Sequence, residues 1–230
     1  MSTVLALHAS TIGIPLLTGG TLARLAEAGQ RVVIVTLTGD PAAEIGEHLG
    51  AARVESLGYA FSPGGACNVP ESALDELETL LADETDISLV LGYDKGGFDL
   101  EPTHALAHRI ATEFAASRGA ALVNAAIPRE MLSKAHTLAK MLGRSTPIDN
   151  EVLDSLPTKS TVDYRINPLT HVPKKWDAVA ELSRGTDRLS QILAKVMQLP
   201  RIMIAPMFKT EYFVNAPESP APVPEYFTAL

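Results

Sequence analysis

The chain has 230 residues, a hydrophobic fraction of 46% and a formal net charge of −8 at pH 7. This length and apolar content predict one domain, with at most a modest extension, around a sizeable core. The acidic balance argues against non-specific nucleic-acid binding, which needs a basic surface. No apolar run is long enough for a membrane span, no secretory signal is recognisable, and the single Cys67 excludes an internal disulfide. We therefore expect a cytoplasmic protein without nucleic-acid or membrane partners.

Strand and helix patterns alternate over the first two thirds of the chain. Short apolar or β-branched runs predict buried strands at 4–8, 31–36, 87–92 and 121–125. Amphipathic spacing predicts helices at 16–28, 41–57, 71–81 and 102–117. The segment 59–68 indicates a short strand or a loop. This order predicts a Rossmann-like, three-layer α/β/α fold with a mostly parallel sheet and right-handed crossovers.

The last third of the chain has a different pattern. Helical spacing predicts helices at 129–142 and 173–198, the second with a possible break at Gly185, and a strand is predicted at 161–166. Four prolines in nine residues, 216–224, indicate an extended arm that docks on this subunit or on a second one, which leaves a homo-oligomer open. We divide the single domain into a core (1–127), cap elements (128–215) and a Pro-rich tail (216–230).

A histidine ends the first predicted strand. The strand runs from Val4 to His8, and Ser10 and Thr11 follow directly, before a helix that begins near Gly19 and Gly20. Open α/β sheets bind their ligands beyond the carboxyl ends of the strands. His8 is therefore a candidate for chemistry.

Residues 4–40 resemble the LmbE-like, or PIG-L, deacetylases. The resemblance is carried by the strand ending in His8, the helix over 20–29 and the strand over 31–38. It implies a Rossmann-like zinc amidohydrolase that removes N-acyl groups from amino sugars or cleaves related amides. The first motif of that family is His-Pro-Asp-Asp-Glu, in which the His and the second Asp bind zinc and the first Asp is the general base. A later His-x-Asp-His motif supplies the third zinc ligand with its last His.

Carried over to this sequence, the resemblance places His8 at the first ligand, Ser10 at the base and Thr11 at the ligand carboxylate. The later motif corresponds to residues 101–104, with His104 at the third ligand. The segments 93–98, 176–184 and 211–214 also resemble the family, so the resemblance extends over most of the chain.

The departures from the family motif change the chemistry that the site supports. A threonine hydroxyl is a weak zinc ligand, and a serine cannot take a proton from zinc-bound water near neutral pH. The first interpretation is therefore an enzyme without the usual zinc site or any other cofactor, acting on a small polar molecule such as an amide, an N-acyl compound or a natural-product intermediate. Its catalytic residues are His8, Ser10 and His104, and its substrate-binding residues are Thr11, Asp94, Gly97, Glu101 and His108.

Two other interpretations stay open. In one, zinc is retained with substitute ligands, namely His8, His104 and Glu101, or with Asp94 or His108 in place of Glu101. His104 and His108 are spaced i, i+4 and share one helix face, which suits metal binding. In the other, the chain is a non-catalytic protein that binds a ligand or a partner subunit.

Overall fold

The computed structural model describes residues 2–60, 70, 72–94, 102–141, 153–154, 156–185, 188–198, 205 and 208–230. Within these residues the strands form a seven-stranded sheet in the order β3-β2-β1-β4-β5-β7-β6. Their bounds are β1 (Thr3–His8), β2 (Arg31–Thr38), β3 (Arg53–Tyr59), β4 (Ile87–Tyr93), β5 (Ala121–Ala126), β6 (Tyr164–Ile166) and β7 (Glu211–Asn215). The pairs among β1–β5 are parallel, whereas β7 pairs antiparallel with β5 and β6. The predicted α/β class is confirmed.

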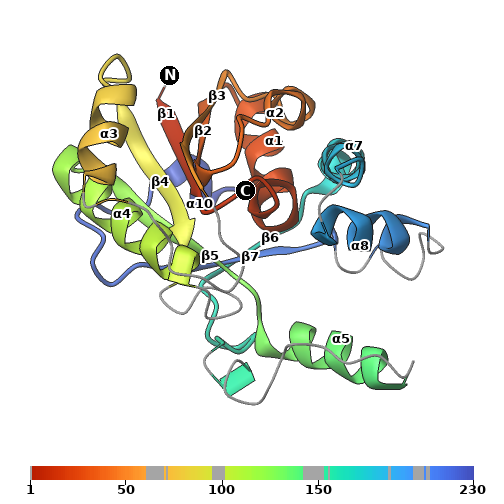
Figure 1. The fold of residues 1–230 in the computed structure, drawn as a ribbon. Helices are drawn as coiled ribbons and strands as arrows, with labels where there is room; N and C mark the ends of the chain where they lie inside the picture. Colours follow the sequence, from red (N-terminus) through yellow and green to blue (C-terminus); the bar gives the residue numbers. More distant parts are fainter. Residues whose placement is uncertain are drawn as a thin grey trace.

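Helices cover both faces of this sheet, with α1, α2 and α7 on one side and α3 and α4 on the other (Figure 1). The helices are α1 (Gly19–Glu27), α2 (Ala43–Leu49), α3 (Ala73–Leu80), α4 (Pro102–Arg118), α5 (Arg129–Met141), α7 (Val172–Leu182), α8 (Arg188–Met197) and α10 (Glu225–Thr228). A π-helical turn, η1 (Ile14–Thr18), precedes α1, and a 3₁₀ turn, η2 (Leu169–His171), precedes α7. None of the helices in the described ranges is long and apolar enough to cross a membrane.

The hydrophobic core lies along β1, β2, β4 and β5 and the helices packed on them. Every residue of β1 is buried, as is all of β2 after Arg31. Continuous apolar runs of this kind are typical of parallel strands covered on both faces, and this is why the sequence predicts them. The strands at 4–8, 31–36, 87–92 and 121–125 are confirmed, each extended by no more than two residues at either end.

Several predicted boundaries are corrected. The helix expected over 41–57 ends at Leu49, because Gly50 adopts a left-handed conformation (φ 75°) that closes the helix, and β3 then occupies 53–59. The helical segment 173–198 is two helices, α7 and α8, on either side of Gly185.

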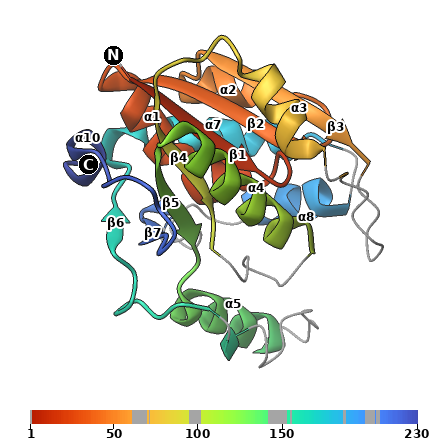
Figure 2. The ribbon, with the colours of Figure 1, turned by 90° about the vertical axis from the view of Figure 1, so that its left-hand side faces the viewer.

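The C-terminal tail packs against the sheet of its own chain. Phe227 is 1% exposed, and its ring makes edge-on contacts with Tyr164 of β6 and Phe213 of β7. Two views agree that α10 lies close to the sheet (Figures 1 and 2). Docking on this subunit was one of the two alternatives that the proline-rich sequence left open.

Candidate functional site

The histidine at the tip of β1 is fully engaged in hydrogen bonds. His8 is 1% exposed; its Nδ1 lies 3.1 Å from the Tyr93 hydroxyl and its Nε2 lies 3.0 Å from Thr18 Oγ1. The Thr18 hydroxyl donates its proton to the Ile14 carbonyl (3.1 Å), so it accepts from Nε2–H of His8. Nδ1 then carries the lone pair and accepts from Tyr93. Both ring nitrogens of a neutral imidazole are therefore satisfied.

The surroundings of His8 favour this neutral form. Burial lowers the pKa of His8 from 6.5 to about 3, and repulsion from His104 lowers the pKa further. At neutral pH the ring stays uncharged, and its one lone pair is used by the Tyr93 hydroxyl. In this arrangement neither ring nitrogen of the neutral imidazole is free for a further partner.

A glycine makes the contact between His8 and Tyr93 possible. A Cβ atom at Gly13 would lie 2.1 Å from Tyr93 Oη and 3.0 Å from His8 Nδ1. Gly13 belongs to the turn that contains Ser10 and Thr11, and its N–H donates to the Ser10 carbonyl (3.2 Å). The half-buried Ser10 and Thr11 are thus placed in this turn beside His8.

Tyr93, at the end of β4, joins three histidines that the sequence analysis singled out. Its hydroxyl bonds to His8, its ring centroid lies 4.9 Å from that of His104, and its carbonyl oxygen lies 2.8 Å from Nδ1 of His108. Figure 2 shows α4, which carries the last two histidines, running alongside β4 and β1. Sequence reasoning did not identify Tyr93, although it is the first residue of the loop segment 93–98 that resembles the family.

A shallow cleft, too tight to hold a water molecule, lies at the carboxyl ends of β4 and β5. It is lined by Leu17, Tyr93, Asp94, Ala125, Ala126, Ile127 and Pro157. Of the predicted site residues, Asp94 lines this cleft, and its N–H donates to the Ala125 carbonyl (3.2 Å). His8, Ser10, Thr11, His104 and His108 lie outside the lining of the cleft. Gly97 and Glu101 fall outside the described residues.

The start of α1 binds a carboxylate of the protein itself. Glu211 Oε2 accepts from the N–H (2.7 Å) and the hydroxyl (2.6 Å) of Thr21, and Oε1 accepts from the Gly20 N–H (2.8 Å) and from Lys175 Nζ (2.6 Å). The Lys175 and Glu211 side chains are each 1% exposed. Gly20 is needed for packing, since a Cβ there would lie 2.4 Å from Pro168. The helix N-terminus, a potential anion site, is therefore already occupied.

The described residues do not fit the zinc site that the family resemblance implies. Both nitrogens of His8 are hydrogen-bonded, and hydroxyl groups stand at both carboxylate positions, Ser10 and Thr11. Over the described ranges, no group of three or more His, Cys, Asp or Glu side chains is arranged to hold a metal ion. Zinc in proteins is held by His, Cys and carboxylate ligands, so this donor set is chemically unsuited to it.

Neither a family model nor a curated protein sequence matches this chain. Solved structures do match in fold. GalB, the 4-carboxy-2-hydroxymuconate hydratase from Pseudomonas putida, is 15% identical at a TM-score of 0.57, over 97% of this chain and 98% of the hydratase. The N,N'-diacetylchitobiose deacetylase from Pyrococcus horikoshii is 16% identical at 0.56, over 94% of this chain and 84% of the deacetylase. A zinc-inhibited form of the teicoplanin deacetylase Orf2 is 13% identical at 0.53, over 94% and 99%. These structural matches show a common fold.

Proposed function

We propose that this chain, which has the fold of the LmbE-like deacetylases, is a metal-independent protein of that fold that transforms a small polar molecule at the carboxyl end of its sheet. The observation that carries the proposal is the hydrogen bonding of His8. Hydroxyl groups of Tyr93 and Thr18 occupy both of its ring nitrogens, at the position where the family resemblance places the first zinc ligand. Zinc at this position would have to displace either the Tyr93 or the Thr18 hydroxyl from the His8 ring.

We place the substrate at the carboxyl edge of the sheet beside this cluster, because Tyr93 and Asp94 lie there and open α/β sheets bind ligands at this edge. Similar solved structures include deacetylases and a hydratase, so the fold accommodates more than one reaction. We assign His8 a positioning role, because it orients Tyr93, and we assign proton transfer to the histidines of α4. Amides, N-acyl compounds and natural-product intermediates stay the proposed substrate classes.

A second candidate function is ligand binding without turnover. One observation favours it. Both nitrogens of His8, and the Gly20 and Thr21 N–H groups at the start of α1, already make hydrogen bonds to other parts of the protein. Under this alternative, replacing His8 or His104 affects stability alone.

Metal analysis of the untagged protein, purified without chelator and then incubated with excess zinc, tests the proposal. We expect no stoichiometric metal in the wild-type protein, and no difference from the His8→Ala/His104→Ala variant. The exposed His48 on α2 supplies the control variant His48→Ala, which accounts for zinc held by a surface imidazole. Near-stoichiometric zinc that is lost only in the double variant would overturn the proposal.

A further inference from the structure

We propose that His171 is a pH-sensitive clasp, which holds the segment 167–171 against α1 while its ring is protonated and releases it as the pH rises. The side chain of His171 is 8% exposed. Its Nδ1 lies 3.1 Å from the Pro168 carbonyl oxygen. Its Nε2 contacts Oε2 of Glu27, the last residue of α1.

Both partners of the His171 ring are hydrogen-bond acceptors. A carbonyl oxygen only accepts, and the Glu27 carboxyl group, whose side chain is 64% exposed, is a carboxylate near neutral pH and likewise only accepts. A neutral imidazole has one N–H group, so it satisfies one of these two contacts and leaves the other without a proton. Both contacts are satisfied when both nitrogens donate, and the geometry therefore corresponds to the imidazolium form of His171.

The partners of His8 are of a different kind. The hydroxyl groups of Tyr93 and Thr18 donate as well as accept, so they satisfy a neutral ring. The carbonyl and the carboxylate at His171 cannot change roles in this way. When the His171 ring loses one proton, a nitrogen lone pair faces an oxygen lone pair and one of the two contacts must break. The pH dependence thus follows from the chemistry of the partners.

The other charged groups near His171 do not replace Glu27. α1 and α7 pack against η2, the turn that contains His171, and the first turn of α7 has no acidic residue. Besides Glu27, the charged side chains in the last turn of α1 and the first turn of α7 are Arg24, Lys174 and Lys175, which are all basic. Lys175 is paired with Glu211. Among the carboxylates of the described ranges, Glu27 is the one in contact with the His171 ring.

The clasp fastens one end of a segment that crosses a face of α1. Near the start of α1, Pro168 packs so closely on Gly20 that a Cβ atom there would lie 2.4 Å from the proline. One helical turn further on, Arg24 Nη1 donates to the Asn167 carbonyl (2.8 Å). These contacts do not involve a group that titrates near neutral pH. We therefore expect deprotonation to loosen η2 and the start of α7 while the rest of the fold persists.

Urea unfolding of the whole chain at pH 6 and pH 8.5 tests the clasp. At pH 6 a histidine is largely charged in the unfolded chain as well, whereas at pH 8.5 the unfolded chain has lost this proton, since the ordinary pKa of histidine is about 6.5. The clasp then stabilises the folded chain at pH 6 and ceases to do so at higher pH. We expect the folding equilibrium constant to fall by about three- to tenfold between pH 6 and pH 8.5, as for a partly exposed, charge-assisted hydrogen bond. In His171→Gln this fall should be absent.

Glu27→Gln is the sharper variant, because it keeps the size of the side chain. A glutamine amide donates as well as accepts, so it also satisfies Nε2 of a neutral His171 ring. We expect Glu27→Gln to abolish the fall between pH 6 and pH 8.5, and Glu47→Gln, on the exposed face of α2, to retain it. A wild-type equilibrium constant that is the same at both pH values, or a fall that persists in His171→Gln and Glu27→Gln, would overturn the proposal.

A measurement on the wild-type protein keeps the test independent of variant folding. Long-range ¹H–¹⁵N correlation spectra report which nitrogens of each histidine are protonated. At pH 6 we expect both nitrogens of His171 to be protonated, with slow exchange of both protons with water because both are hydrogen-bonded. His8 should carry a proton on Nε2 alone. A neutral His171 ring, or ring protons that exchange as fast as those of the exposed His48, would contradict the clasp.

Discussion

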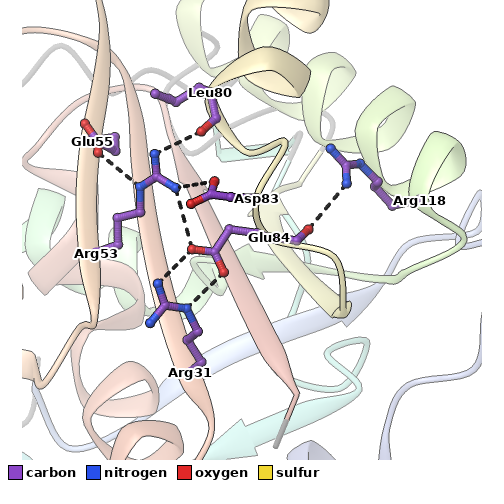
Figure 3. A network of polar contacts seen from close by, with 7 residues as sticks. All are labelled: Arg31, Arg53, Glu55, Leu80, Asp83, Glu84 and Arg118. Carbon is purple, nitrogen blue, oxygen red and sulfur yellow. Dashed lines mark hydrogen bonds and ion pairs between the residues drawn. The ribbon is translucent and has the colours of Figure 1, made fainter.

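The two ends of the sheet hold their polar groups in different ways. At the amino end, charged side chains at the starts of β2 and β3 meet the acidic loop before β4 (Figure 3). Glu84 accepts two hydrogen bonds from Arg31 (2.8 and 2.9 Å), and Arg53 bonds to Glu55 and Asp83. The Glu84 side chain is 5% exposed, but the two arginines that it binds are 38% and 21% exposed, so water reaches this network from the arginine side.

At the carboxyl end the polar groups are removed from water. His8, Tyr93 and Thr18 form a neutral, buried cluster, and the Lys175–Glu211 pair next to it is 1% exposed on both sides. A buried polar group costs far more when it loses its partner than an exposed one does. We therefore expect the carboxyl end, which has fewer charged side chains, to tolerate substitution least, and it is the end where we place the function.

The largest expected effect on the free energy of unfolding comes from replacing a glutamate by glutamine, once at each end of the sheet. In Glu211→Gln, Lys175 is left buried without a countercharge, and we expect the free energy of unfolding to fall by about 3–5 kcal/mol. In the matched variant Glu84→Gln, water reaches the arginines, and we expect a loss of about 1 kcal/mol. Urea unfolding at pH 7 measures both. Equal losses of the free energy of unfolding in the two variants would show that the two ends depend equally on their carboxylates.

Glu84 adds a pH test of the amino end alone. Hydrogen bonds from Arg31 hold the pKa of the Glu84 carboxyl below its usual range. A carboxyl group with a lowered folded pKa stabilises the protein above its ordinary pKa of 4.5, and this stabilisation is lost as the pH falls through the folded value. The difference in the free energy of unfolding between Glu84→Gln and the wild-type protein should therefore disappear in acid.

The second prediction concerns the pH dependence set by the carboxyl end. The pKa of His8 is about 3 in the folded chain against an ordinary value of 6.5, so between these values the unfolded chain binds a proton that the folded chain does not. We therefore expect the contribution of His8 to stability to be greatest above pH 6.5, and the folding equilibrium constant to fall by about tenfold per pH unit below it. Over two pH units this contribution lowers the free energy of unfolding by about 3 kcal/mol.

Unfolding experiments from pH 7 to pH 4.5 check this slope. We expect His8→Gln to flatten it, because glutamine does not titrate, and we expect the exposed His48→Gln to leave it unchanged. A wild-type slope that persists in His8→Gln would mean that His8 is protonated in the folded protein near its ordinary pKa.

These two ends also differ in how far the sequence predicts them. Continuous apolar runs in the sequence predict the buried parallel strands, and the end of the first run predicts the position of His8. The partners of His8 do not follow, because Tyr93 is 85 residues away and no local pattern marks a buried hydroxyl. The helix expected over 41–57 failed at Gly50, where the chain turns from helix to edge strand over a few residues with little change in polarity.

The last prediction compares two tyrosine hydroxyls at opposite ends of β4. Tyr93 closes the strand and bonds to His8, whereas the Tyr226 hydroxyl bonds to Ser88 Oγ (2.8 Å) near the strand's start. Tyr93→Phe leaves Nδ1 of His8 buried without a donor, so we expect the free energy of unfolding to fall by about 1–3 kcal/mol. Tyr226→Phe breaks a half-buried bond that water can replace, and we expect a loss of about 0.5–1 kcal/mol.

Thermal and urea unfolding of the two variants, with the histidine nitrogen spectra of Tyr93→Phe, decide between these outcomes. Loss of the Tyr93 donor removes the reason for His8 to keep its lone pair on Nδ1, and so the His8 signals should change while those of the exposed His48 do not. A Tyr93→Phe variant as stable as Tyr226→Phe, with unchanged His8 signals, would mean that the tyrosine does not hold the ring. The first-ligand position of His8 would then be open to a metal ion after all.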